Sequence, residues 1–244
     1  MRKKRHGSER LSSLSALLCA DAAALRENPS AQFLAPAPLC LEIGCGKGEF
    51  ICTLSEREPS FNYFAMEKID DVLVVAMEKY AARRGLGRLG VHGGWDAPDG
   101  RNYGGGDVWD IPMEMRGNVR FLSGDAKSLP ELFPENTFAA IHANFSDPWT
   151  KGGYEARRLT APGFLAIYAR LLAPGGMFYF KTDNVKLFEY SLETVAASPL
   201  SLTFMTDDLH ASSRAAQNIM TEYERSFTAR GVKIHALHAR RDFV

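Results

Sequence analysis

Three acidic residues each stand at the end of an apolar stretch of the chain: Glu42 in LEIG, Glu67 in NYFAMEK and Asp125 in LSGDA. The carboxylate of Glu67 is placed to accept hydrogen bonds from ribose hydroxyls, and that of Asp125 can accept one from the exocyclic amine of an adenine. Glu42 would attract a cationic group. In this order, the three acids predict a pocket for a nucleoside that carries a positive charge.

The turn that follows Glu42 reads GCGKG. Glycines at this place let the backbone turn tightly and bring bare N–H groups next to a ligand. Their spacing is G-x-G-x-G, whereas the fingerprint that cradles a pyrophosphate is G-x-G-x-x-G. Glu42 would repel a pyrophosphate but suits an ammonium and a sulfonium. We therefore predict S-adenosylmethionine as the cofactor, bound by Glu42, Gly44, Gly46, Gly48, Glu67 and Asp125.

A second set of reactive residues lies in NFSDPWTK, after the apolar stretch FAAIHA. Enzymes that methylate amino groups of nucleic acids carry Asn or Asp followed by Pro-Pro-aromatic at the corresponding place. Here Asp147 precedes Pro148 and Trp149, and one carboxylate can accept from both N1–H and N2–H₂ of a guanine. Trp149 would contribute about 1–3 kcal/mol if it stacked on a base. A packing role for this indole is equally compatible with the sequence.

Basic residues gather in two places, although the formal net charge is zero. Lys151, Arg157 and Arg158 follow the segment that contains Asp147, and a basic tip occupies residues 2–10. Salt screens charges beyond about 8–10 Å, so a local basic patch can bind phosphates even on a neutral protein. The alternative for the tip is a solvated tail. The distribution of charge is thus compatible with an RNA partner.

The elements that must position these side chains alternate between strands and helices. Apolar stretches predict strands at 39–44, 62–68, 119–125, 138–145, 176–183, 201–208 and 233–241. Apolar residues at helical spacing predict helices at 47–58, 70–85, 163–176 and 185–198. Continuous apolar strands separated by helices indicate a parallel sheet covered on both faces. We therefore expect a doubly wound α/β fold, mostly parallel, with an antiparallel strand near the end.

The chain divides into a basic tip with a helical segment over residues 1–34 and one domain over 35–244. Residues 85–118 are crowded with glycine and show no sustained periodicity, so we expect an insertion there, either a mobile lid or a plain surface loop.

Composition disfavours several other classes of protein. No apolar run reaches 18 residues, so no membrane span is expected. The segment after the basic tip is interrupted by Asp21, Arg26 and Glu27, unlike a secretory signal, and we expect a cytoplasmic protein. The four cysteines form no C-x-x-C pair, and none lies with a histidine at zinc-ligand spacing, so we expect no metal.

Taken together, the motifs resemble a known family, the bacterial tRNA (guanine-N7-)-methyltransferases. The resemblance runs from LEIGCGKGEF through NFSDPWTKGGYEARRLT and FKTDN to IMTEYERSF, which is nearly the whole chain. It implies the seven-stranded fold of class I S-adenosylmethionine-dependent methyltransferases. It also implies methyl transfer to N7 of a guanosine in tRNA, with the variable-loop guanosine as the suggested target. The partner would be tRNA, and the protein a monomer or a homodimer.

The resemblance further implies roles for single residues. Glu42, Glu67, Asp125 and Asp147 resemble the family's cofactor-site acids, with Asp147 also catalytic. Contacts to the RNA substrate are implied for Lys151, Arg157, Arg158, Asp183, Thr221, Glu222, Tyr223 and Glu224. The family's segment after DPW is usually rich in lysine and histidine, whereas this one reads TKGGYEA, which thins its positive charge. The glycine-rich insertion is also atypical, and both departures bear on RNA affinity rather than on chemistry.

The implied reaction asks little of acid–base catalysis. Guanine N7 has a free lone pair and no proton to lose, so it needs no general base, and positive charge passes from sulfur to the imidazole ring of the base. Alignment of the reacting atoms can contribute about 7–11 kcal/mol. A carboxylate such as Asp147 near the purine would stabilise the developing cation.

Three other functions compete with this one. An NAD-dependent oxidoreductase shares the doubly wound fold, but the G-x-G-x-G spacing, Glu42 and the lack of an evident His–Arg or Tyr–Lys set disfavour it. A DNA amino-methyltransferase would carry Pro-Pro-aromatic and a separate target-recognition domain. An RNA-binding module without activity would not need the complete set of acids.

Overall fold

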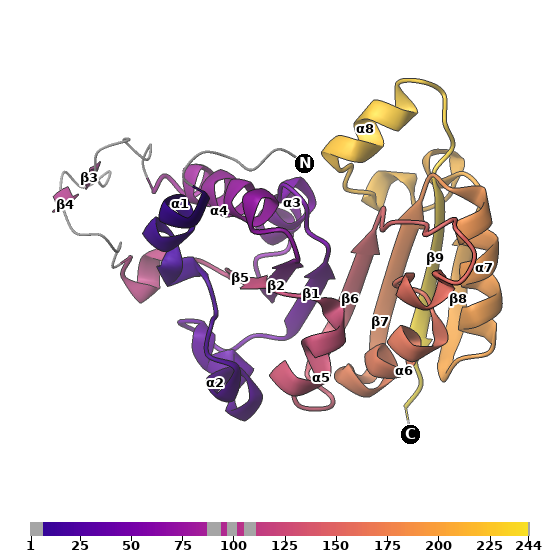
Figure 1. Cartoon of the computed structure of the whole chain (residues 1–244), viewed down its shortest axis with the longest axis horizontal. Helices are drawn as coiled ribbons and strands as arrows, with labels where there is room; N and C mark the ends of the chain where they lie inside the picture. The colour runs from indigo at the N-terminus through magenta and orange to yellow at the C-terminus, as the bar shows by residue number, and fades with distance from the viewer. Residues whose placement is uncertain (1–6, 87–93, 97–101, 105–110, 244) are drawn as a thin grey trace.

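The computed structural model describes residues 7–86, 94–96, 102–104 and 111–243 (Figure 1). Most of the basic tip lies outside the described residues, as does most of the glycine-rich insertion. Within that insertion, β3 (Gly94–Asp96) pairs antiparallel with β4 (Asn102–Gly104). The lid and the RNA contacts predicted for these two stretches therefore stay predictions.

A seven-stranded sheet in the order β5-β2-β1-β6-β7-β9-β8 forms the middle layer. Its strands are β1 (Leu39–Ile43), β2 (Asn62–Glu67), β5 (Val119–Ser123), β6 (Phe138–Asn144), β7 (Leu172–Thr182), β8 (Leu200–Thr206) and β9 (His235–Arg241). Neighbours from β5 across to β7 pair in parallel, whereas β9 runs antiparallel to both β7 and β8. The predicted doubly wound, mostly parallel sheet is confirmed.

Helices cover the sheet on both faces (Figure 1). On one face lie α1 (Gly7–Ser13), α3 (Glu49–Arg57) and α4 (Asp70–Arg83). On the other lie α2 (Ala22–Glu27), α5 (Leu129–Leu132), α6 (Pro162–Leu171) and α7 (Val185–Ala196). The last helix, α8 (Glu222–Thr228), lies beyond the end of the sheet to which the arrowhead of β6 points (Figure 1).

Local chemistry explains why these elements begin and end where they do. All five residues of β1 are buried, as expected for a parallel strand between two helical layers. The helix predicted over 163–176 is too long, because α6 ends at Leu171 and β7 begins at Leu172. Pro174 cannot continue a helix and disfavours helical backbone in the residue before it, so the chain turns into the strand early.

The strand order reverses between β1 and β6. From β1 the chain passes through α3 to β2 on one side, whereas β6 pairs with β1 on the other side. In open α/β sheets, ligands bind at the carboxyl ends of the strands at such a switch point. Glu67 ends β2, Asn144 ends β6 and Glu42 is the fourth residue of β1, so all three lie near this edge.

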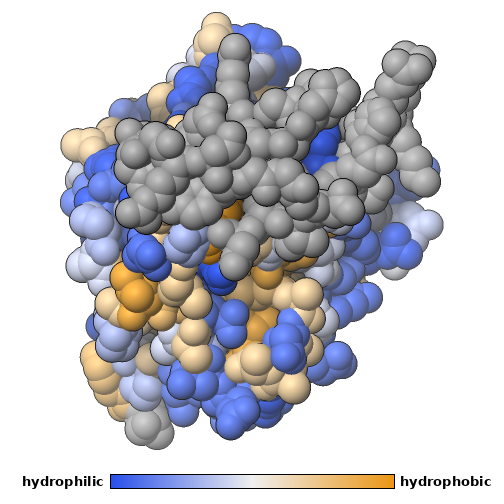
Figure 2. Space-filling view, turned by 90° about the vertical axis from the view of Figure 1, so that its left-hand side faces the viewer, coloured by the Kyte–Doolittle hydropathy of each residue, from blue (hydrophilic) through white to orange (hydrophobic). Residues whose placement is uncertain are grey.

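On the side of the molecule that carries α1, small apolar patches lie among hydrophilic ones wherever described residues form the surface (Figure 2). Such scattered exposure of apolar residues is normal for a globular protein. In the part of the chain that the structure describes, no helix is both long and apolar enough to cross a membrane.

Candidate active site

A cavity of about 820 Å³ opens at the carboxyl ends of β1, β2 and β6. This volume lies in the range of small-molecule and cofactor sites. The cavity wall contains most of the residues that the sequence singles out: Glu42, Gly44, Gly46, Glu67, Asp125, Asp147, Arg157, Thr221, Glu222 and Tyr223. The fold thus brings acids predicted to bind the cofactor and residues predicted to contact RNA to one site.

The glycine turn forms one wall of this cavity. Gly44, Gly46 and Gly48 all have positive φ, at +73°, +56° and +80°, where a side chain is strained. A Cβ on Gly44 or Gly46 would meet no described atom within 4 Å, so bare backbone faces open space. A Cβ on Gly48 would lie 2.8 Å from the Cβ of Ala76 in α4. The first two glycines leave room for a ligand, and the third lets α3 and α4 pack closely.

Glu42 is the most buried acid of the wall, with 2% of its surface exposed. Its Oε1 accepts a hydrogen bond from Nδ2 of Asn144 at 3.1 Å, while its Oε2 has no hydrogen-bond partner among the described residues. Burial raises the pKa of Glu42 to about 8, although the bond from Asn144 and the charge of Lys181 act to lower it. A buried oxygen without a partner is rare, and here it marks the place of a donor that a ligand would supply.

Glu67 and Asp125 are held in place by their own neighbours. Glu67 accepts from the backbone N–H groups of Gly46 at 3.1 Å and Lys68 at 2.9 Å. Asp125 accepts from Nζ of Lys68 at 2.8 Å and from the N–H of Lys127 at 3.0 Å. These two bonds, that from Lys68 first, lower the pKa of Asp125. A carboxylate has about four acceptor positions, so both acids keep capacity for a ribose hydroxyl or an adenine amine.

The loop that carries Asp147 is held in an uncommon backbone conformation. Phe145 and Trp149 have φ of +52° and +42°, which costs a non-glycine residue about 1–3 kcal/mol each. Arg158 pins the loop, because its Nε donates to the carbonyl of Pro148 at 2.9 Å. The carboxylate of Asp147 itself is exposed at the cavity wall. Backbone strain that the surrounding structure maintains is typical of functional sites, and here it lies beside the exposed carboxylate of Asp147.

The adjacent residues Arg157 and Arg158 have different surroundings. The guanidinium of Arg157 lies 5.0 Å from the ring centroid of Trp149 and 4.5 Å from that of Tyr154, and it faces the cavity. That of Arg158 lies 4.3 Å from the ring of Tyr190 and bonds to the loop backbone. The guanidinium of Arg157 can therefore bind an anionic ligand, whereas that of Arg158 already bonds to the protein.

The TEYE segment opens α8 with a capping box. Oγ1 of Thr221 accepts from the N–H of Glu224 at 2.9 Å, and the side chain of Glu224 accepts from the N–H of Thr221 at 3.3 Å. Thr221 and Tyr223 line the cavity, whereas Glu224 is fully buried. Burial raises the pKa of Tyr223, and the charges of Asp183 and Asp147 raise it further. Asp183 therefore lies close to the cavity without lining it.

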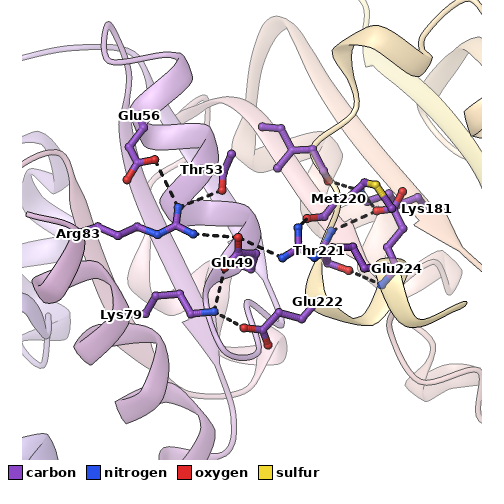
Figure 3. A network of polar contacts seen from close by, with 12 residues as sticks. Glu49, Thr53, Glu56, Lys79, Arg83, Lys181, Met220, Thr221, Glu222 and Glu224 are labelled. Carbon is purple, nitrogen blue, oxygen red and sulfur yellow. Dashed lines mark hydrogen bonds and ion pairs between the residues drawn. The ribbon is translucent and has the colours of Figure 1, made fainter. Parts of the chain in front are cut away.

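Ion pairs join α8 to α3 and α4 (Figure 3). The carboxylate of Glu49 pairs with Lys79 at 3.0 Å, Arg83 at 2.9 Å and Arg225 at 3.2 Å. Lys79 also pairs with Glu222, so the two carboxylates share one ammonium (Figure 3). Since Glu49 and Glu222 both line the cavity, this network holds two of its walls together.

Some predicted residues stand outside the cavity wall: Gly48, Lys151, Arg158, Asp183 and Glu224. Lys151 is exposed on the loop after Trp149. Arg158 and Glu224 bond to other parts of the protein, so their geometry favours positioning over the RNA contact that the sequence predicts for them.

Two residues to which the sequence analysis gives no role also belong here. Asn144 orients the carboxylate of Glu42. Lys181, 5% exposed, bonds to Glu224 beneath the TEYE segment. A signal for Lys181 exists in the sequence, because a lysine in the apolar stretch GMFYFKTD has to be buried with partners.

The donor set of the cavity fits S-adenosylmethionine. The unpaired Oε2 of Glu42 suits a cation, the open backbone at Gly44 and Gly46 leaves room for the ligand, and Glu67 and Asp125 can accept from its nucleoside. Among the described residues, no group of three or more His, Cys, Asp or Glu side chains is arranged to hold a metal ion.

The chain is similar to known methyltransferases over most of its length. A family model described as "Putative methyltransferase" matches residues 36–237. The tRNA (guanine-N(7)-)-methyltransferase of Listeria welshimeri is 40% identical over 205 residues, which cover 84% of this chain and 81% of that protein. The protein of the same name from Exiguobacterium sibiricum is 35% identical over 225 residues, which cover 92% and 91%.

Solved structures are similar in fold at low sequence identity. An antibiotic-related methyltransferase has a TM-score of 0.57 at 16% identity, with 94% of this chain and 98% of that chain covered. The 16S rRNA methyltransferase KamB has a TM-score of 0.56 at 15% identity, covering 88% and 92%. The match to the methyltransferase family model, together with this fold, identifies a class I S-adenosylmethionine-dependent methyltransferase. Within that class, the chain belongs to the tRNA (guanine-N7-)-methyltransferase family.

Proposed function

We propose that the protein transfers a methyl group from S-adenosylmethionine to N7 of a guanosine in tRNA, and that this guanosine is the one in the variable loop. The observation that carries the proposal is the single cavity in which the cofactor acids meet Asp147 and Arg157. The relatives' name gives the reaction. The competing functions, an oxidoreductase, a DNA amino-methyltransferase and an idle RNA-binding module, have no support from these relatives.

In this proposal, the residues at the ends of β1, β2 and β5 hold the cofactor. Glu42 binds its ammonium, Glu67 its ribose hydroxyls and Asp125 its adenine amine. When bound, the cofactor would supply an electrophilic methyl group on a sulfonium. The lone pair of guanine N7 would form the new bond to this methyl group without loss of a proton, and the sulfur would leave as a neutral thioether. The task of the protein is then to align the two ligands and to exclude water from the contact between them.

Asp147 is the catalytic residue of the proposal. Its exposed carboxylate accepts from N1–H and N2–H₂ of the target guanine and stabilises the positive charge that the purine acquires. The neighbouring Trp149 is the indole over which Arg157 lies, so its ring stays available for a base only on the opposite face. Arg158 holds this loop in position from outside the cavity.

The RNA backbone would lie along the exposed cations at the cavity mouth. Lys151 and Arg157 are exposed and close to the Asp147 loop, where a phosphate would pass. Tyr223, Thr221 and Glu222 line the same cavity, with Asp183 nearby. The protein acts on tRNA, and we place this action in the cytoplasm.

The site of methylation can be tested with transcripts that lack all modifications. Wild-type protein should methylate a tRNA transcript that carries the variable-loop guanosine and leave unchanged a transcript in which only that guanosine is replaced by adenosine. Mapping of 7-methylguanosine by cleavage at the modified nucleotide reads the position directly. Equal methylation of both transcripts would show that the target guanosine lies elsewhere in the tRNA.

A further inference from the structure

Lys181 is a buried cation for which the proposed reaction has no direct use. It lies in β7, and its side chain is 7% exposed. Its Nζ donates to Oδ1 of Asn218 at 2.9 Å, to the carbonyl of Ile219 at 2.7 Å and to Oε2 of Glu224 at 2.6 Å. An ammonium has three donors, so each has a partner in the segment that leads into α8.

Glu224 connects Lys181 to the wall of the cavity. Besides the bond from Lys181, it accepts from Nδ2 of Asn218 at 2.6 Å and faces Nε2 of His210 at 3.0 Å. It also accepts from the N–H of Thr221, whose side chain lines the cavity. The ammonium of Lys181 thus fixes the first turn of α8 relative to the sheet.

The backbone of the same lysine holds the loop that carries Asp147. The carbonyl of Lys181 accepts from the N–H of Phe145 at 2.8 Å, at the residue with positive φ. The ammonium lies 5.7 Å from the ring centroid of Phe145 and 5.3 Å from that of Phe50. Phe145 begins the loop that carries Asp147, and its ring centroid lies 5.2 Å from that of Tyr223. Lys181 therefore contacts the supports of two adjoining parts of the cavity wall.

The charge of Lys181 faces acids on two neighbouring elements. Glu224 approaches from α8, and Glu42 acts on it from β1. On β6, His142 is the titratable neighbour, and burial lowers its pKa to about 3, with a further lowering by Lys181. Glu42 faces Glu67 from β2 in addition to Lys181. Lys181 is also the β7 partner of Asn144, whose side chain bonds to Glu42, so the positive charge of Lys181 favours the charged form of Glu42.

We propose that Lys181 is a positioning residue for the methyl transfer, which sets the Thr221–Tyr223 wall through its ammonium, the Asp147 loop through its carbonyl, and the charge state of Glu42 through space. The proposal rests on the proposed function for the identity of the two ligands. The inference goes beyond the proposed function because it makes one buried lysine the link between the cofactor side and the substrate side of the cavity.

The first test replaces Lys181 by methionine, which keeps the length of the side chain and removes its charge. Lys181→Met should lower kcat/KM for tRNA by about 10- to 100-fold, because the Thr221–Tyr223 wall loses the contact that fixes it and the ring of Phe145 loses the neighbouring cation, although the backbone bond to Phe145 remains. It should also move the midpoint of the pH dependence of S-adenosylmethionine affinity to higher pH, measured by calorimetry without tRNA. Titration of the cofactor itself affects all variants equally, so a difference in the pH midpoint between variants arises from the protein. Lys181→Arg, which keeps the charge, should restore the midpoint.

A second variant covers the case in which Lys181→Met does not fold. Glu224→Gln is nearly isosteric and breaks the charge pair, so it should lower kcat by about tenfold or more in a folded protein. An unchanged kcat in Glu224→Gln would overturn the proposal whether or not Lys181→Met folds. If Lys181→Met folds and the two residues act through one contact, the double variant should lose no more activity than the worse single variant. Losses that simply multiply would overturn the link between Lys181 and α8.

Arg120 supplies the matched control. It is another buried cation, 2% exposed, which lies over the ring of Phe33 and bonds to carbonyls near its own strand, away from the cavity. Arg120→Met should destabilise the fold without moving the pH midpoint. A midpoint that moves equally in both variants, or in neither, would contradict the proposal. Because binding is measured without tRNA, a protein that binds the cofactor but methylates no tRNA would overturn the proposed function alone.

Discussion

Nδ2 of Asn144 donates to Oε1 of Glu42 over 3.1 Å, and this bond joins β6 to β1 where the strand order of the sheet reverses. It leaves Oε2 of Glu42, a residue of the cavity wall, as a buried oxygen without a partner among the described residues. Asn144 also ends the strand from which the Asp147 loop departs. The acid proposed to bind the cofactor is therefore oriented by the residue that begins the substrate loop.

Replacement of Glu42 by glutamine should weaken S-adenosylmethionine binding by about 10- to 100-fold at pH 8, because a hydrogen bond to a charged group is lost. The pKa of Glu42 is about 8 in the free protein, so the wild type must release a proton to bind a cation at lower pH. Its affinity should fall as the pH decreases from 8 to 6. Calorimetry over this range should show that dependence in the wild type and lose it in Glu42→Gln. A dependence that survives the substitution would assign it to another group.

The same acid should make the stability of the cofactor-free protein depend on pH. The folded pKa, about 8, is above the ordinary value of 4.5, so between these values the folded state holds a proton that the unfolded state releases. This contribution to stability is complete below about pH 4.5 and is lost as the pH rises through about 8. Urea unfolding at several pH values should show a decline in the wild type relative to Glu42→Gln. A constant difference between the two proteins would contradict a buried neutral Glu42.

Replacement of Asp147 by asparagine should lower the rate of methyl transfer by about 100-fold, since the charge that stabilises the methylated purine is removed. Cofactor affinity should stay within a few-fold of the wild type, because Glu42, Glu67 and Asp125 are untouched. Single-turnover kinetics with saturating tRNA separates the chemical step from RNA binding. An unchanged single-turnover rate would exclude Asp147 as the catalytic acid.

Replacement of Arg157 and replacement of Arg158 should have different effects on the protein. Arg157→Met should raise KM for tRNA and reduce the salt dependence of binding by about one unit of slope, as expected for a lost phosphate contact. Arg158→Met should instead lower kcat and the free energy of unfolding, by about 1–2 kcal/mol, because the loop carbonyls lose their donor. The two variants serve as controls for each other. A salt slope in Arg157→Met equal to that of the wild type would mean that Arg157 meets no phosphate.

The fold was largely predictable because its signals are local. The five parallel strands β1, β2, β5, β6 and β7 are apolar stretches of the sequence. An acid near the carboxyl end of such a strand has to lie at the edge of the sheet where ligands bind. Glu42, Glu67 and Asp125 could be placed in one cavity for this reason. The end of α6 was misjudged because the effect of Pro174 on the residue before it outweighs a helical apolar pattern.

The supporting residues of the site could not be predicted in the same way. Lys181 and Glu224 are 43 positions apart, and their ion pair depends on how α8 returns to the sheet. The difference between Arg157 and Arg158 depends on Tyr190, a residue of α7 that stacks with only one of them. Such contacts are set by tertiary packing, and no periodicity of the sequence carries them.

The most direct measurement is methyl transfer from labelled S-adenosylmethionine to unmodified bulk tRNA, followed by nucleoside analysis. The account predicts a peak of labelled 7-methylguanosine that is absent without the protein and strongly reduced with Asp147→Asn. Tight cofactor binding without any labelled 7-methylguanosine would contradict the proposed function, and the thinned basic segment that contains Lys151 would be the first place to look for the reason.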